Sequence, residues 1–117
     1  MSKTSETGAR YEQLAAKHIQ DSGLAIVTQN YRSKGGEIDL IAKDSNTIVF
    51  IEVKYRRHTS FGSAIEQVTQ SKMHKLRRCA EHYIQYNNIK QPCRFDVIGI
   101  SGDHAAAPNI DWIKNAF

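Results

Sequence analysis

The sequence predicts an α/β fold in which a mixed central sheet is flanked by helices. Three observations support this prediction. Apolar residues recur with a helical period in two segments, β-branched residues form short runs elsewhere, and segments of the two kinds alternate along the chain. The predicted order is one helix, three strands, a second helix and two strands. Because the second helix is long enough to be a right-handed crossover, the strands before and after it should be parallel.

The first helix is expected at about residues 7–22, where apolar residues repeat at a spacing of three and four. Its apolar face consists of Tyr11, Leu14, Ala15 and Ile19. Gly23 is a natural end for this helix. The β-branched segment 25–31 predicts the first strand, and the pair Gly35-Gly36 predicts a turn after it.

The next two strands are expected to form a hairpin. They cover about residues 37–42 and 48–55, and the polar segment between them is typical of a hairpin turn. If the turn pivots between Ser45 and Asn46, the register of opposed residues follows. The pairs are then Asp39 with Glu52, Glu37 with Lys54, and Ile41 with Phe50. One face would carry Ile38, Leu40, Ala42, Val49, Ile51 and Val53, and the other would carry Ile41, Ile48 and Phe50.

The second helix is predicted to start at Ser71, a plausible N-cap, with some helix allowed earlier at residues 63–68. Its apolar stripe consists of Met73, Leu76, Ala80, Tyr83 and Ile84. Asn87-Asn88 should end it. Segment 94–100 alternates like a strand, and segment 109–114 predicts a last strand more weakly.

One domain spanning residues 1–117 is expected, because a chain of 13.2 kDa is too short for two ordinary cores. Hydrophobic residues make up 40% of the chain and charged residues 24%, which excludes a disordered or fibrous protein. The start of the chain lacks the apolar segment of a signal peptide, and no apolar run is long enough for a membrane span. Cys79 and Cys93 are too few for a disulfide framework. We therefore expect a cytoplasmic protein with no membrane partner.

Basic residues are concentrated in one segment. Seven of the 16 Lys and Arg residues lie between residues 54 and 78, where Glu66 is the single acid. Such a segment is typical of a surface that binds nucleic-acid phosphates. It is equally typical of the solvated face of a helix, and charge alone does not decide between the two.

The predicted hairpin places two carboxylates opposite each other. Asp39 and Glu52 would share one face of the sheet, and Lys54 would project from the same face. Opposed carboxylates repel, so a sequence selected for stability alone would avoid this pair. A divalent cation removes the repulsion, and carboxylate oxygens suit Mg²⁺ or Mn²⁺. The alternative is a set of ordinary surface charges, with a cross-strand salt bridge between Glu37 and Lys54.

Four segments of the chain resemble an uncharacterised bacterial family. They are GGEIDLI at 35–41, FIEVKYR at 50–56, Phe61-Gly62, and RFDVI at 94–98. They are similar to the YraN-like family, which is assigned to the PD-(D/E)xK, restriction-endonuclease-like superfamily and is often compared with Holliday-junction resolvases. The resemblance covers nearly the whole chain. It implies a restriction-endonuclease-like αβββαβ core.

The resemblance also implies a set of site residues. Asp39 and Glu52 look like the metal-binding acids, and Lys54 looks like the catalytic lysine. Glu12 on the first helix matches an acidic position that related resolvases use beside the metal. By its place off the centre of the apolar stripe, Glu12 could also be a solvated residue. Ile38 stands where the superfamily usually has a proline.

The leading hypothesis is a Mg²⁺- or Mn²⁺-dependent nuclease that hydrolyses phosphodiester bonds in DNA, with branched, Holliday-junction-like DNA as a candidate substrate. Asp39, Glu52 and the main-chain carbonyl of Val53 would hold the ion, and Lys54 would position or activate the attacking water. The residues expected to hold the nucleic-acid backbone are Arg56, Arg57, Gln67, Lys72 and Lys75. RNA is a less favoured substrate, and the family analogy allows a homodimer. The alternatives are a non-catalytic nucleic-acid-binding module on the same fold and a structural or partner-binding protein.

Overall fold

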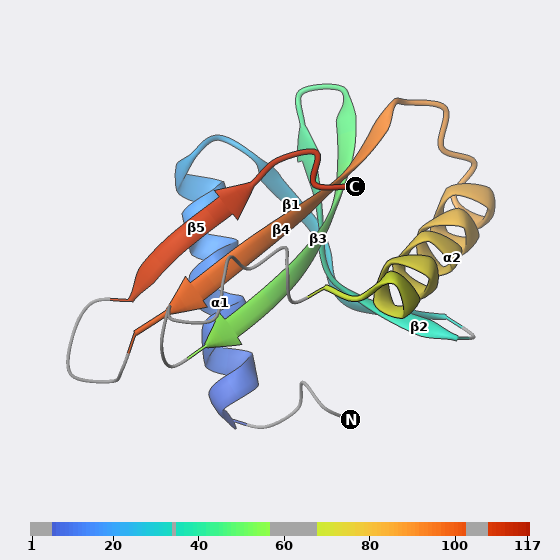
Figure 1. The fold of residues 1–117 in the computed structure, drawn as a ribbon. Helices are drawn as coiled ribbons and strands as arrows, with labels where there is room; N and C mark the ends of the chain where they lie inside the picture. Colours follow the sequence, from blue (N-terminus) through green and yellow to red (C-terminus); the bar gives the residue numbers. More distant parts are fainter. Residues whose placement is uncertain (1–5, 34, 57–67, 103–107) are drawn as a thin grey trace.

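Helices and strands follow the predicted order. The computed structural model describes residues 6–33, 35–56, 68–102 and 108–117, and Figure 1 shows their arrangement. The elements are α1 (Glu6–Asp21), β1 (Ala25–Ser33), β2 (Gly36–Asp44), β3 (Thr47–Arg56), α2 (Gln70–Tyr86), β4 (Cys93–Ser101) and β5 (Asn109–Ile113). Most of the early helical segment allowed at residues 63–68 lies outside the described residues. In the described part of the chain, neither helix has the length and apolar character needed to cross a membrane.

The strands of the described chain form one mixed sheet in the order β1-β2-β3-β4-β5. β3 and β4 are parallel, with Ile48 opposite Cys93 and Arg56 opposite Ser101. The other neighbouring strands are antiparallel. The parallel pairing across α2, which the crossover argument predicts, is therefore confirmed.

The two helices cover opposite faces of this sheet. Successive residues of β3 demonstrate it, because Val49, Ile51 and Val53 belong to the apolar cluster of α1, whereas Ile48 and Phe50 belong to that of α2. The central strands are thus buried on both sides. Figure 1 shows α1 behind the sheet and α2 beside β2, at the far side from β5.

The predicted hairpin register is confirmed between β2 and β3. Leu40 pairs with Ile51, and Asp44 pairs with Thr47 at the turn. The pairing recorded between the two strands ends at Leu40 and Ile51, immediately before the two predicted acids. β2 continues beside β1 beyond this point, and β3 continues beside β4. The strands that carry the acids therefore separate where the acids lie.

The expected face of Ile38 is wrong. Ile38 belongs to the apolar cluster of α2, whereas Leu40 and Ala42 belong to that of α1. Strict alternation would place all three residues on one face. The neighbouring strand is irregular at this level, because Asn30 of β1 has a left-handed backbone with φ of 53°. We attribute the change of face around Asp39 to this irregularity together with the loss of β3 as a pairing partner.

The expected cross-strand pair of Glu37 and Lys54 is also wrong. Glu37 is paired with Arg32 of β1, and Arg32 Nε lies 3.5 Å from Glu37 Oε2. Lys54 instead lies near Glu52 of its own strand. The register argument assumed that β2 and β3 stay paired to their ends, and their separation removes that pairing.

The second helix begins earlier than predicted. Thr69 rather than Ser71 is its N-cap, and the Thr69 hydroxyl accepts a hydrogen bond from the backbone nitrogen of Lys72 at 3.1 Å. Both hydroxyls suit a cap, and only the backbone geometry decides between them. The predicted end is confirmed, because Asn87 Nδ2 donates to the carbonyl of Tyr83 at 3.0 Å.

Gly36 allows α2 to lie directly against the start of β2. A Cβ atom here would lie 2.9 Å from the backbone oxygen of Lys75 and 3.5 Å from the Cβ of Cys79. Gly36→Ala should therefore lower the free energy of unfolding by about 1–3 kcal/mol, the usual penalty of overpacking. Urea denaturation measures this change. A loss below about 0.5 kcal/mol, the range of neutral surface substitutions, would show that α2 shifts without resistance.

Candidate active site

The Asp39 side chain spans the gap where β2 and β3 separate. Asp39 is 1% exposed, and its Oδ2 accepts a hydrogen bond from the backbone nitrogen of Val53 at 2.8 Å. Because Val53 follows Glu52 directly, this bond fixes the Asp39 carboxylate beside the backbone of the second acid. The expected ladder pair of Asp39 with Glu52 lies beyond the recorded pairing of the two strands. Asp39 reaches β3 instead by a contact from its side chain to the backbone of Val53.

The carboxylate of Glu52 is buried close to two lysines. Glu52 is 2% exposed, and its Oε2 lies 3.7 Å from Lys54 Nζ and 3.4 Å from Lys72 Nζ. Lys54 belongs to the same strand, whereas Lys72 comes from the first turn of α2. Burying a carboxylate is unfavourable unless an opposite charge accompanies it. These two ammonium groups supply that charge.

Glu12 of α1 lies on the same hollow as Lys54. The hollow has a volume of about 240 Å³ and is lined by Gly8, Tyr11, Glu12, Val53, Lys54 and Tyr55. The rings of Tyr11 and Tyr55 stack with their centroids 3.8 Å apart, which holds α1 against the end of β3. Glu12 is only 3% exposed, so its interpretation as a solvated residue is wrong.

Asn30 is a polar neighbour of this site that the sequence analysis did not find. With its amide nitrogen turned toward the carboxylates, Asn30 donates to Glu12 Oε1 at 2.9 Å and to Glu37 Oε2 at 3.2 Å. Its left-handed backbone makes this reach from β1 possible, and asparagine tolerates that conformation better than most residues. The sequence signal was weak, because an asparagine inside a strand-like segment has many ordinary explanations.

The residues predicted to bind phosphate are spread over different elements. Lys72 lies at the acids rather than apart from them. Arg56 is partly exposed at the end of β3, and Lys75 is exposed on α2 one turn beyond Lys72. Arg57 and Gln67 lie outside the described residues.

The donor atoms at the site suit a hard divalent cation. Asp39 and Glu52 offer carboxylate oxygens, and the carbonyl of Val53 lies in the peptide group between Val53 and Lys54. Oxygen donors of these kinds bind Mg²⁺ and Mn²⁺. The described residues contain no group of three or more His, Cys, Asp or Glu side chains that could hold a metal ion. An ion here would therefore depend on two carboxylates, a carbonyl and water, which is common for Mg²⁺.

The comparison with known sequences assigns the chain to a family. The model of the uncharacterised protein family UPF0102 matches residues 11–100. The chain belongs to this family. A UPF0102 protein from Aeromonas hydrophila is 49% identical over 113 residues, which cover 94% of this chain and 83% of that protein. UPF0102 proteins from Stutzerimonas stutzeri and Saccharophagus degradans are 42% and 44% identical over 119 residues, covering all of this chain and 98% and 97% of those proteins.

The expectation of an uncharacterised family with bacterial members is confirmed. The segment matched by UPF0102 contains the acids Glu12, Asp39 and Glu52, as well as Lys54 and the whole of α2. The acids and lysines of the candidate site in this UPF0102 chain thus lie inside the matched region, whereas Gly8, which lines the same hollow, precedes it.

Proposed function

We propose that this chain is a Mg²⁺- or Mn²⁺-dependent nuclease that hydrolyses phosphodiester bonds in DNA, branched DNA included, on a restriction-endonuclease-like αβββαβ core. The observation that supports the proposal is the position of Asp39 and Glu52. Both acids are buried where two strands separate, and Lys54 Nζ lies 3.7 Å from Glu52 Oε2. Buried acids in neighbouring positions destabilise a fold, so this arrangement calls for a functional reason.

Each residue has a role in the proposed reaction. Asp39, Glu52 and the carbonyl of Val53 would hold the ion, which when bound activates water and stabilises charge on the phosphate. The hydrogen bond from the Val53 amide keeps the Asp39 carboxylate in one orientation. Lys54 would orient the attacking water and balance the developing negative charge. Glu12 would hold water in the hollow that it shares with Lys54.

The lysines beside Glu52 favour a second candidate function, a non-catalytic nucleic-acid-binding module. Their charges balance part of the buried acid, so a metal ion is not required to explain its burial. In this alternative, Lys54 and Lys72 serve the stability of the fold. DNA binding without turnover of any substrate would support it.

A nuclease panel tests the proposed reaction. Linear, branched and single-stranded DNA and single-stranded RNA are incubated with the chain and Mg²⁺ or Mn²⁺. Cleavage of DNA is expected, and it should disappear with EDTA or with Asp39→Asn, a variant of nearly the same shape. Equal cleavage by wild type and Asp39→Asn would contradict the proposed site, and the absence of any cleavage would favour the binding module.

Metal binding can be measured without any substrate. Mn²⁺ at about 100 times its Kd should stabilise the folded chain by about 2.7 kcal/mol, or roughly 10 °C in Tm for a chain of this size. Asp39→Asn should remove this response, because it removes one anionic ligand. Asp21→Asn at the exposed end of α1 is the matched control and should respond like wild type. Equal shifts in wild type and Asp39→Asn would exclude Asp39 as a ligand.

A further inference from the structure

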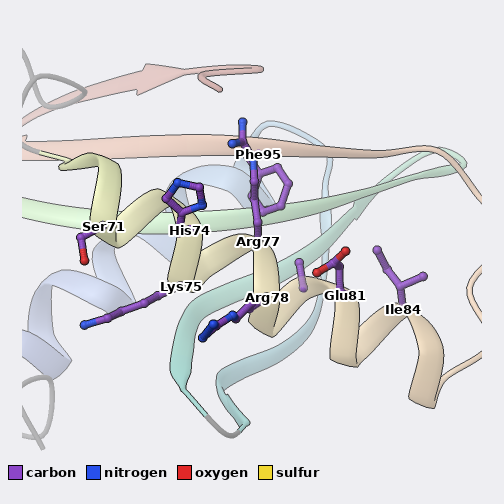
Figure 2. Close-up of a pocket in the computed structure, with 9 residues that line it drawn as sticks. Ser71, His74, Lys75, Arg77, Arg78, Glu81, Ile84 and Phe95 are labelled. Carbon is purple, nitrogen blue, oxygen red and sulfur yellow. The ribbon is translucent and has the colours of Figure 1, made fainter.

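A second and larger hollow lies between α2 and β4. Its volume is about 870 Å³. The side chains of Lys75, Arg77 and Arg78 contribute to its lining and are exposed, whereas Ala80, Ile84 and Phe95 supply apolar surface. Figure 2 shows the basic side chains projecting from α2 and Phe95 reaching in from β4. We call this the α2 hollow.

The hollow exists because of where α2 sits on the sheet. Gly36 brings α2 close to β2, and Tyr83 of α2 packs edge-on against Tyr31 of β1. Phe95 of β4 stacks on Phe117 near the C-terminus with ring centroids 5.2 Å apart, and Arg77 of α2 lies 5.5 Å from the centre of the Phe117 ring. The hollow is lined by α2 together with Phe95 of β4.

Charge and shape together define the ligand that the hollow fits. Three cations line it against one acid, Glu81. This favours a ligand with several negative charges. The apolar surface of Ile84 and Phe95 favours a ligand that also carries flat apolar groups. Single-stranded nucleic acid combines the two, because its unpaired bases are free to leave the stack.

We propose that the α2 hollow binds a single-stranded segment of nucleic acid, with its phosphates on Lys75, Arg77 and Arg78 and a base against Ile84 and Phe95. Lys72, Lys75 and Arg78 follow each other at a spacing of three residues, or about 4.5 Å along the helix axis for each step. The row therefore leads from the buried acids to the hollow. A duplex cannot place a base on the apolar surface without unpairing.

The choice of nucleic acid as the ligand of the hollow rests on the proposed function. If the acids cleave DNA, the preferred substrate carries a single-stranded arm next to the bond that is cleaved. Binding in the hollow itself requires no metal and no cleavage, so it can be measured separately.

The test is equilibrium binding of a fluorescent oligothymidylate of about a dozen nucleotides, within the site size of single-strand binders, in EDTA and over a range of salt. The wild type should bind it more tightly than a blunt duplex of the same length. Each phosphate contact contributes about 0.7 to the slope of log K against log salt on single strands. Replacing both Lys75 and Arg78 with Gln should therefore reduce the slope by about 1.4. An unchanged slope would overturn the proposal.

Two further variants separate the hollow from general basic charge. Glu81→Gln should tighten binding a few-fold, because it removes the acid from the lining, and Ile84→Glu should weaken it. Lys17→Gln is the matched control, since Lys17 is exposed on α1 and paired with Asp21. If Lys17→Gln weakens binding as much as Lys75→Gln does, the effect is nonspecific and the proposal is wrong.

Competition with polyglutamate tests the identity of the ligand, and comparison with DNA cleavage separates the hollow from the proposed function. If polyglutamate competes as well as the oligothymidylate at equal charge, the hollow is a site for acidic peptides and the proposal is wrong. If oligothymidylate binding depends on the hollow but no DNA is cleaved, the hollow stands and the nuclease assignment fails. If DNA is cleaved but the hollow variants bind oligothymidylate normally, the nuclease assignment stands and the proposal for the hollow fails.

Discussion

Lys54→Ala is expected to lower the single-turnover rate of DNA cleavage by about 100- to 10,000-fold, the usual contribution of a positioned proton-transfer group. The affinity for DNA should change far less. Lys54 lies 3.7 Å from the buried Glu52 and lines the hollow that contains Glu12, so its ammonium group stands at the proposed reacting water rather than on the outer surface. An interaction made mainly in the transition state lowers the rate without a matching loss of binding.

Lys43→Ala provides the control for this experiment. Lys43 is an exposed residue of the same hairpin, near the turn between β2 and β3, and its removal should leave the cleavage rate unchanged. If Lys54→Ala lost only affinity, with bound DNA cleaved at the wild-type rate, Lys54 would be a phosphate-binding residue and its catalytic role would be refuted.

Asp96→Ala is expected to lower the free energy of unfolding by about 3–5 kcal/mol, the loss typical of removing one partner from a buried charge pair. Asp96 is fully buried in β4. Its carboxylate accepts hydrogen bonds from Arg94 Nε at 3.1 Å, from Trp112 Nε1 at 2.9 Å and from the backbone nitrogen of Asn115 at 2.9 Å. Without it, all three donors lose the buried acceptor that they share and, within the described chain, Arg94 keeps only its hydrogen bond to Asp44.

Asp44→Ala tests whether burial is the cause. Asp44 Oδ2 accepts a hydrogen bond from Arg94 Nη1 at 2.9 Å, but its side chain is 36% exposed. Burial tends to lower the pKa of Arg94, yet the hydrogen bonds to Asp96 and Asp44 raise it. We expect Asp44→Ala to reduce stability by no more than about 1 kcal/mol. Urea denaturation measures the free energy of unfolding of both variants. Equal losses of this free energy would show that the burial of Asp96 does not cause its larger expected effect.

The sequence was sufficient for those parts of the fold that depend on local patterns. The hairpin register follows from a short turn at Ser45 and Asn46 and from apolar residues that must be buried on both faces. The parallel pairing of β3 and β4 follows from the length of the segment between them. Both are consequences of strand geometry and chain connectivity, which a single sequence contains.

Features that depend on packing at long range were not predictable in the same way. Ile38 changes face where β2 loses β3 as a neighbour while it stays paired with an irregular β1, which no alternation pattern records. Lys72 lies beside Glu52 because α2 docks at a particular height on the sheet, and its charge alone suggested an outer phosphate contact. Asn30 of β1, which has a left-handed backbone, meets Glu12 because α1 packs near this strand. In each case the decisive fact is the position of a second element.

The order of strands in the sheet has a consequence for how the protein folds. β1, β2 and β3 are neighbours both in sequence and in the sheet, so the strands that carry Asp39 and Glu52 can assemble through short-range contacts. Pairing of β3 with β4 joins Ile48 to Cys93 and must first close a long loop, which carries a larger entropic penalty and slows folding. We therefore expect the two acids to be positioned in an early meander, while the lysine on α2 that lies beside Glu52 arrives when the remainder of the chain closes over it.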